Sequence, residues 1–197
     1  MNLPNKLTVF RILLVPILVL VWLFPFKVFN VSFYVFNIAN LTLSVHNLIL
    51  LAIFVIASIT DYLDGHIARS RNMVTSFGKF LDPIADKLLI NTSFILLAYT
   101  RAIPVVPVLI MLARDTIVDC VRMIAAQNGK VVSAGMLGKT KTVLQMITII
   151  LTLLNNLPFE IWHLDVASLF LWAATIVSVM SGFEYFKGVK DDIFKTI

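Results

Sequence analysis

Charged residues are scarce in this sequence, and cysteine is nearly absent. Of 197 residues, 14% are Asp, Glu, Lys or Arg, whereas soluble domains carry about 25%. So little charge excludes a water-soluble globular domain, and the 59% hydrophobic share indicates a membrane protein. Cys120 is the one cysteine, so the chain cannot form an internal disulfide. Its apolar neighbours indicate a small buried residue rather than a nucleophile.

Long apolar runs occupy most of the chain. Each spans roughly 16–22 residues, and about 20 are needed to cross a bilayer. The runs are approximately Leu7–Phe24, Asn47–Asp64, Asp82–Tyr99, Pro104–Ala125, Thr142–Leu157 and Val166–Phe186. The fifth reaches this length only if its helix also includes Gly138 to Lys141. The stretch from Phe26 to His46 is interrupted by asparagines, so we expect a loop or an interfacial segment there. These runs predict an all-α integral membrane fold with six transmembrane helices, in a single domain over residues 1–197.

Basic residues gather on one side of the predicted membrane. With six spans both termini share a side, and all of the 16 lysines and arginines except Lys27 and Arg101 fall on it. The positive-inside rule therefore predicts that both termini face the cytoplasm, in the plasma membrane. The net charge of +5 then reflects topology and lipid headgroups rather than binding to nucleic acid.

Four aspartates lie in the apolar runs at helical spacing. Asp61 and Asp64 are three residues apart, and Asp82 and Asp86 are four apart, so each pair shares one helix face. If the intervening segment turns the chain back, both pairs face one polar cavity that opens to the cytoplasm. Carboxylates this close repel one another unless some are protonated or cations lie among them. Magnesium, manganese or calcium would suit such ligands, and two ions could clamp a pyrophosphate. The alternative is that these are solvated carboxylates paired with nearby basic residues, namely Arg69, Arg71 or Lys87.

The order of residues around these aspartates resembles the signature of the CDP-alcohol phosphotransferases. It runs Asp61-Tyr-Leu-Asp64-Gly65-His-Ile-Ala68-Arg69, eight residues, Gly78, three residues, Asp82, three residues and Asp86. The resemblance implies six transmembrane helices around a cytoplasmic polar cavity, two bound Mg²⁺ or Mn²⁺ ions and a homodimer. It also implies a substrate in which CDP is joined to a lipid or alcohol, and release of CMP.

The same resemblance implies roles for individual residues. Asp61, Asp64 and Asp82 would hold metal. Asp86 would approach the metal as well and act as the general base on the acceptor hydroxyl. The residues implied in nucleotide binding are Gly65, Ala68, Arg69 and Gly78, joined by Asn5 and Thr8 near the start of the chain.

A second basic cluster bears on the acceptor. Arg114, Arg122, Lys139 and Lys141 crowd the cytoplasmic side of the fourth and fifth runs, where they could bind a phosphorylated acceptor or simply anchor the helices. Three short stretches, 2–11, 138–145 and 181–186, are similar to the bacterial branch of the family that uses glycerol 3-phosphate. That branch usually has a glutamate where this chain has Asp115. The resemblance implies CDP-diacylglycerol as donor, glycerol 3-phosphate as acceptor and phosphatidylglycerol phosphate as product, with membrane lipids as surroundings.

Other functions are compatible with parts of this pattern. The same chemistry could use serine, inositol phosphate or phosphatidylglycerol as acceptor. A small ion transporter also carries acids within its membrane spans, but those acids are expected across the bilayer depth or in both halves of a repeat. A lipid-binding protein without catalysis would not need four metal-ready carboxylates.

Overall fold

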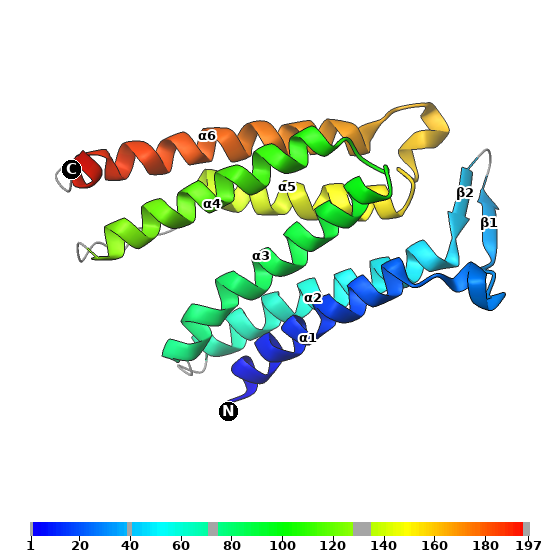
Figure 1. Ribbon diagram of the computed structural model, residues 1–197, viewed down its shortest axis with the longest axis horizontal. Coiled ribbons are helices and arrows are strands. Elements are labelled where there is room, and N and C mark those ends of the chain that lie inside the picture. The colour runs from blue at the N-terminus through cyan, green and yellow to red at the C-terminus, as the bar shows by residue number, and fades with distance from the viewer. Residues whose placement is uncertain (1, 39–40, 71–74, 128–134, 195–197) are drawn as a thin grey trace.

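The computed structural model consists of long helices that run back and forth along one direction (Figure 1). It describes residues 2–38, 41–70, 75–127 and 135–194. Within them the helices are α1 (Leu3–Leu23), α2 (Val45–Ser70), α3 (Ser76–Tyr99), α4 (Val105–Gln127), α5 (Met136–Leu153) and α6 (Val166–Phe194). Each overlaps one of the six predicted runs, and the bounds differ most for α2, α3, α5 and α6. Because α5 begins at Met136, it includes Gly138 to Lys141, as the length of the fifth run required.

The starts of α1 and α3 are capped and tied together. Asn2 caps α1 by accepting a hydrogen bond from the Asn5 amide at 3.2 Å. Thr75 caps α3, and its hydroxyl accepts from the Gly78 amide at 3.0 Å. The same hydroxyl donates to Asn5 Oδ1 at 3.0 Å. A Cβ at Gly78 would lie 3.1 Å from that Asn5 oxygen, so a glycine at this position lets the two helix starts approach.

The helices form two groups of three. α1 packs on α2 and α3, and α6 packs on α4 and α5. α3 joins the groups because it also contacts α4 and α5, as its oblique path in Figure 1 shows. One buried apolar cluster runs through both groups; it includes Leu18, Phe54, Leu89, Phe94, Ile149 and Leu171. Both chain ends, the end of α2 and the start of α3 lie at the same end of the molecule.

Four of the described helices are long and apolar enough to cross a membrane. Among the described residues these spans are Leu3–Leu23, Val45–Ala68, Met136–Leu153 and Val166–Gly188. The prediction of a largely helical membrane protein is therefore confirmed. α3 and α4 are about as long, with 24 and 23 residues, but they carry the charged residues of the predicted cavity. That all six cross the membrane stays a prediction.

Apolar side chains cover much of the outside of the molecule. Leu20 is 67% exposed and Leu109 is 58% exposed, as expected for helices that face lipid. Cys120 is also exposed, so the prediction that it is buried was wrong. In a membrane protein apolar neighbours mark the lipid-facing surface as well as the interior, and hydrophobicity cannot distinguish the two.

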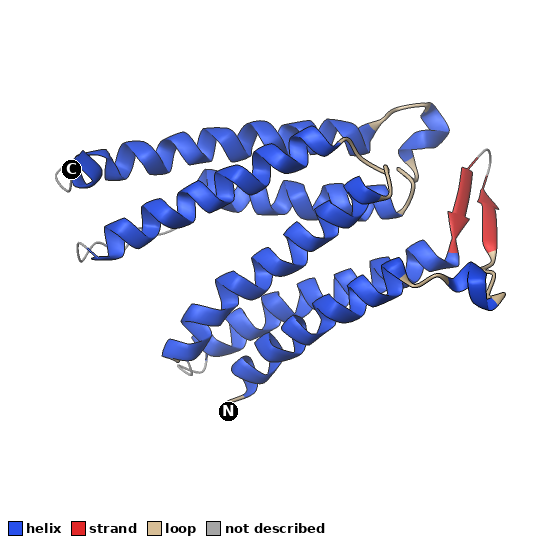
Figure 2. Cartoon of the chain, viewed as in Figure 1, coloured by secondary structure: helices blue, strands red, loops and turns tan. Residues whose placement is uncertain are grey.

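The segment between α1 and α2 differs from the all-α prediction. It contains a 3-10 turn, Phe26–Phe29, and two short antiparallel strands, β1 (Val35–Ile38) and β2 (Leu41–Ser44). Val35 pairs with Ser44, and Ile38 with Leu41. Branched and aromatic residues favour strands here. Figure 2 shows this hairpin at the end of the molecule opposite to both termini.

Candidate functional site

The first part of the site is a cluster of aspartates organised by α1. The Arg11 side chain is fully buried, and its guanidinium contacts carboxylates on α2. Arg11 Nη1 lies 2.5 Å from Asp61 Oδ1, and Nη2 lies 2.5 Å from Asp64 Oδ2. Because Asp61 and Asp64 are one helical turn apart, a single guanidinium reaches both.

Thr8 extends this cluster to α3. It lies one turn before Arg11 on α1, and its hydroxyl is 2.8 Å from Asp82 Oδ1 and 3.3 Å from Asp64 Oδ2. A hydroxyl has one proton to donate, so the shorter contact, to Asp82, is the stronger one. α1 thus brings together Asp61, Asp64 and Asp82, three of the four predicted metal ligands.

The aspartate cluster fits a hard divalent cation by charge and by donor type. Among the described side chains three carboxylates face one guanidinium there, which leaves an excess of negative charge at a site where Asp64 is buried and Asp61 and Asp82 are partly exposed. Carboxylate oxygens are the ligands that magnesium and manganese prefer. In the arrangement seen, Arg11 and Thr8 engage oxygens that a metal would need. Accordingly, no group of three or more acidic, histidine or cysteine side chains in the described ranges is arranged to hold an ion.

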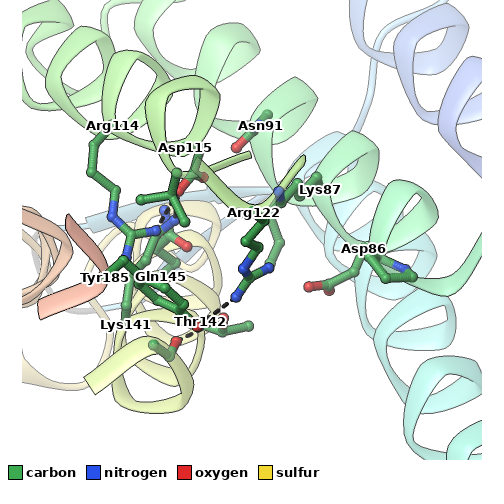
Figure 3. A pocket seen from close by; sticks show the side chains of 14 residues that line it. Asp86, Lys87, Asn91, Arg114, Asp115, Arg122, Lys141, Thr142, Gln145 and Tyr185 are labelled. Atoms are coloured by element: carbon green, nitrogen blue, oxygen red, sulfur yellow. Dashed lines mark hydrogen bonds and ion pairs between the residues drawn. The ribbon is translucent and has the colours of Figure 1, made fainter. Parts of the chain in front are cut away.

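The second part of the site is a polar cavity of about 170 Å³ next to this cluster. Side chains from α3, α4, α5 and α6 line it, and four of them are basic. The lining includes Asp86, Lys87 and Asn91 from α3, Arg114, Asp115 and Arg122 from α4, Lys141, Thr142 and Gln145 from α5, and Tyr185 from α6. In Figure 3 Asp86 lies on one side of this space and Tyr185 on the other, and the Arg122 guanidinium between them is directed at the Tyr185 hydroxyl. The positive lining suits an anionic ligand.

Asp115 holds two of these cations in place. Its Oδ1 accepts from Arg114 Nη1 at 2.9 Å and also pairs with the Lys141 ammonium. All three side chains are largely buried. Asp115 therefore fixes the positions of Arg114 and Lys141 in the cavity, and its negative charge cancels one of their two positive charges. The similar branch usually has glutamate here, but the shorter aspartate makes both contacts in this chain.

Replacing Asp115 by alanine should destabilise the protein, because Arg114 and Lys141 would remain buried without their shared partner. Breaking a buried ion pair on one side typically costs about 3–5 kcal/mol. We expect a lower Tm for Asp115→Ala in detergent, measured by the loss of helical circular dichroism. Asp165→Asn serves as the comparison, because it removes an exposed charge near the start of α6 and keeps the side-chain oxygen that accepts from the Ser168 amide. Equal Tm values for the two variants would contradict the role given to Asp115.

α6 supports both arginines through Tyr185 and its neighbours. Arg122 Nη2 donates to the Tyr185 hydroxyl at 2.5 Å, and the guanidinium carbon lies 4.7 Å from the ring centroid. The Arg114 guanidinium carbon lies 5.7 Å from the same centroid, and Nη2 donates to Ser181 Oγ at 2.7 Å. Such cation–π contacts fix the orientation of guanidinium groups. The Nε atoms of Arg114 and Arg122 are buried and have no hydrogen-bond partner among the described residues.

Gly182 allows Arg114 to lie against α6. A Cβ at this position would lie 3.1 Å from Arg114 Cγ and 3.3 Å from Nε, tighter than ordinary contact. Gly182→Ala should therefore shift Arg114 within the cavity and raise the apparent KM for an anionic acceptor by about threefold to tenfold. Steady-state kinetics would measure this, with Gly188→Ala as the control because no atom lies near that position. A KM unchanged by Gly182→Ala would mean that Arg114 does not bind the acceptor.

Asp86 lies between the two parts of the site. It lines the cavity, and it interacts electrostatically with Asp61 and Arg11 of the aspartate cluster. Lys87 and Lys141 act on it from the cavity side. A carboxylate in this position can approach both a metal held by the aspartates and a ligand held by the cations.

The other predicted site residues are distributed as follows. Arg114, Arg122 and Lys141 line the cavity, whereas Lys139 is exposed and is not part of the lining. Gly65 and Ala68 follow Asp64 on α2 and are partly exposed. The side chain of Arg69 and all of Arg71 lie outside the described residues. Of the basic partners proposed for solvated aspartates, Lys87 pairs with Asp119 on α4 instead.

Some residues of the site were not identified from the sequence. Arg11 was counted among the cytoplasmic basic residues and ended the stretch 2–11 that resembled the glycerol 3-phosphate branch, but no role was attached to it. Lys87 was not assigned to a binding cavity. Tyr185 and Gln145 lay in stretches that resembled the glycerol 3-phosphate branch, but no role was attached to them. The adjacency of Lys87 to Asp86 was the one available signal for its place in the cavity.

The chain is similar to known proteins over nearly its whole length. A family model described as CDP-alcohol phosphatidyltransferase matches residues 1–180. A relative from Bacillus subtilis (strain 168) is 43% identical, with 94% of this chain and 93% of the relative aligned. A relative from Rickettsia bellii (strain RML369-C) is 39% identical, with 96% of each aligned. One from Salmonella choleraesuis (strain SC-B67) is 32% identical over 98% of this chain and 97% of its own. All three are named CDP-diacylglycerol–glycerol-3-phosphate 3-phosphatidyltransferase.

Proposed function

Because this chain belongs to the CDP-alcohol phosphatidyltransferase family, we propose that it transfers the phosphatidyl group of CDP-diacylglycerol to sn-glycerol 3-phosphate. The products are phosphatidylglycerol phosphate and CMP, so the reaction is a step of phospholipid biosynthesis. The names of the three relatives describe this reaction.

The observation that carries the choice of acceptor is the cavity with four basic side chains beside Asp86. An acceptor with a phosphate of its own needs such charges, whereas serine needs much less.

In the proposed reaction the acceptor hydroxyl attacks the β-phosphorus of CDP-diacylglycerol. A new oxygen–phosphorus bond forms, the bond from phosphorus to the CMP oxygen breaks, and Asp86 takes the hydroxyl proton. Arg114, Arg122 and Lys141 hold the acceptor phosphate so that its hydroxyl lies near Asp86. We assign binding of the nucleotide to Gly78, Asn5 and Thr8, together with Gly65, Ala68 and Arg69, which follow Asp64 in the sequence.

The family is generally dependent on divalent metal. We propose that Asp61, Asp64, Asp82 and Asp86 hold one or two Mg²⁺ or Mn²⁺ ions. Bound metal would neutralise negative charge that develops on the phosphates during transfer. The excess of carboxylates over cations that the described part of the aspartate cluster contains supports this assignment.

We further infer that residues 1–197 form one membrane domain with six spans in the plasma membrane, assembled as a homodimer. The distribution of lysine and arginine supports cytoplasmic termini and a site that opens to the cytoplasm. The grouping of both chain ends with the aspartate-bearing ends of α2 and α3 agrees with this orientation.

CMP release by purified protein in detergent tests the proposed function. The assay contains CDP-diacylglycerol and Mg²⁺ or Mn²⁺, and glycerol 3-phosphate, serine, inositol, inositol phosphate or phosphatidylglycerol is added singly. We expect metal-dependent release with glycerol 3-phosphate alone. Release with a different acceptor would support the proposed reaction type but contradict the choice of glycerol 3-phosphate. No release from folded protein with any acceptor would contradict the proposed function.

A further inference from the structure

Arg11 occupies a position that the proposed function leaves unexplained. Among the described side chains it is the basic one in contact with the aspartate cluster, and it has no exposed surface. A buried guanidinium is costly to desolvate and is stable only when it is well paired. Here Asp61 and Asp64 provide that pairing, both at 2.5 Å.

The pairing satisfies the carboxylates as much as the arginine. Asp64 is 2% exposed, and its Oδ2 is in contact with Arg11 and with the Thr8 hydroxyl. Asp82 and Asp86 lie on the neighbouring helix, so without a cation the four negative charges would repel one another strongly. Arg11 therefore supplies positive charge at the place where a divalent ion would supply it.

The same contacts oppose a metal. Oxygens of Asp61 and Asp64 that face the guanidinium cannot ligate an ion from that side, and the described residues offer no ready set of three ligands. We propose that Arg11 is a resident counter-cation that competes with divalent metal for Asp61 and Asp64, so that it stabilises the metal-free protein and weakens metal binding. This inference rests on the proposed metal site.

The competition has two consequences with opposite signs. Removing the guanidinium increases the negative charge at the aspartates, which should tighten metal binding. It also leaves the carboxylates of the metal-free protein without their counter-charge, which should lower its stability. If Arg11 served only to order the metal ligands, its removal would have the opposite effect on metal affinity, because disordered ligands bind metal more weakly.

Mn²⁺ binding in the absence of nucleotide distinguishes these possibilities. Free Mn²⁺ is measured by electron paramagnetic resonance during titration of detergent-solubilised wild type and Arg11→Gln. We expect the Kd of Arg11→Gln to be about tenfold lower, within the range usual for two ligands that oppose each other. Lys6→Gln is the matched control, because it removes an exposed positive charge from the same helix without touching the aspartates, and its Kd should equal that of wild type.

Thermal unfolding gives a second readout that does not depend on activity. Without metal, Arg11→Gln should unfold at a lower temperature than wild type. Saturating Mn²⁺ should raise the Tm of Arg11→Gln by more than it raises the Tm of wild type. If Arg11→Gln does not fold, Arg11→Lys replaces it, because a single ammonium cannot pair with both carboxylates as a guanidinium does. Its Kd should then lie below that of wild type.

The outcomes separate this inference from the proposed function. An equal or higher Kd in a folded Arg11 variant, with Mn²⁺ bound normally by wild type, would overturn the competition and leave the metal site intact. Failure of both wild type and the folded Arg11 variants to bind Mn²⁺ at millimolar concentrations would overturn the inference together with the proposed metal site.

Discussion

Asp86→Asn is expected to reduce CMP release by about 10²–10⁴-fold, the usual contribution of a general base. Asparagine has nearly the same shape as aspartate but cannot accept the acceptor proton. The position of Asp86 between the aspartate cluster and the basic cavity is what makes it the residue that can reach the acceptor hydroxyl. The measurement is the initial rate of CMP release with CDP-diacylglycerol and glycerol 3-phosphate at saturating metal.

The control for this variant is Glu184→Gln, which neutralises an exposed carboxylate on α6 outside the cavity lining. Its rate should remain within about twofold of wild type, as surface substitutions usually do. Mn²⁺ binding measured on Asp86→Asn separates two roles for the carboxylate. A slow variant that still binds Mn²⁺ indicates a base, whereas loss of Mn²⁺ binding indicates a ligand. Activity close to wild type would contradict both roles.

The helices could be predicted from the sequence because each is a long apolar run bounded by breakers. The helix spacing of the aspartates likewise indicated which of them share a face. The hairpin Val35–Ser44 was not predicted, because its strands are only four residues each and an apolar run of that length does not distinguish strand from loop. Nor could hydrophobicity tell whether Cys120 faces lipid or the protein interior.

The partners of the charged residues were much harder to predict. Arg11 pairs with Asp64 across 53 residues, and Arg122 pairs with Tyr185 across 63. Spacing along one helix reveals neighbours three or four residues apart, but it gives no information on which face of one helix meets another. The resemblance supplied the metal and nucleotide residues as a set. It attached no role to Arg11, which lies among the carboxylates, or to Tyr185, which contacts Arg114 and Arg122.

Replacing Arg122 by glutamine tests whether the basic cavity binds the acceptor phosphate, and we expect a large rise in the KM for glycerol 3-phosphate. Hydrogen bonds to charged groups contribute about 1.5–3 kcal/mol, so the apparent KM for glycerol 3-phosphate should rise about 10- to 100-fold. Glutamine retains a hydrogen-bonding group near Tyr185 but not the charge or the planar guanidinium. Because Arg122 would bind the acceptor phosphate rather than the reacting hydroxyl, kcat should fall much less than KM rises.

The comparison of two acceptors makes this prediction specific. Glycerol keeps both hydroxyl groups of glycerol 3-phosphate and lacks its phosphate, so whatever CMP release wild type shows with glycerol should be scarcely changed by Arg122→Gln. Lys187→Gln removes an exposed cation two residues after Tyr185 on α6, outside the cavity lining, and should leave the KM for glycerol 3-phosphate unchanged. If both lysine and arginine variants raised KM equally, the effect would come from the general positive field of this end of the molecule. A selective loss in Arg122→Gln, confined to the phosphorylated acceptor, requires direct contact between the guanidinium and the phosphate.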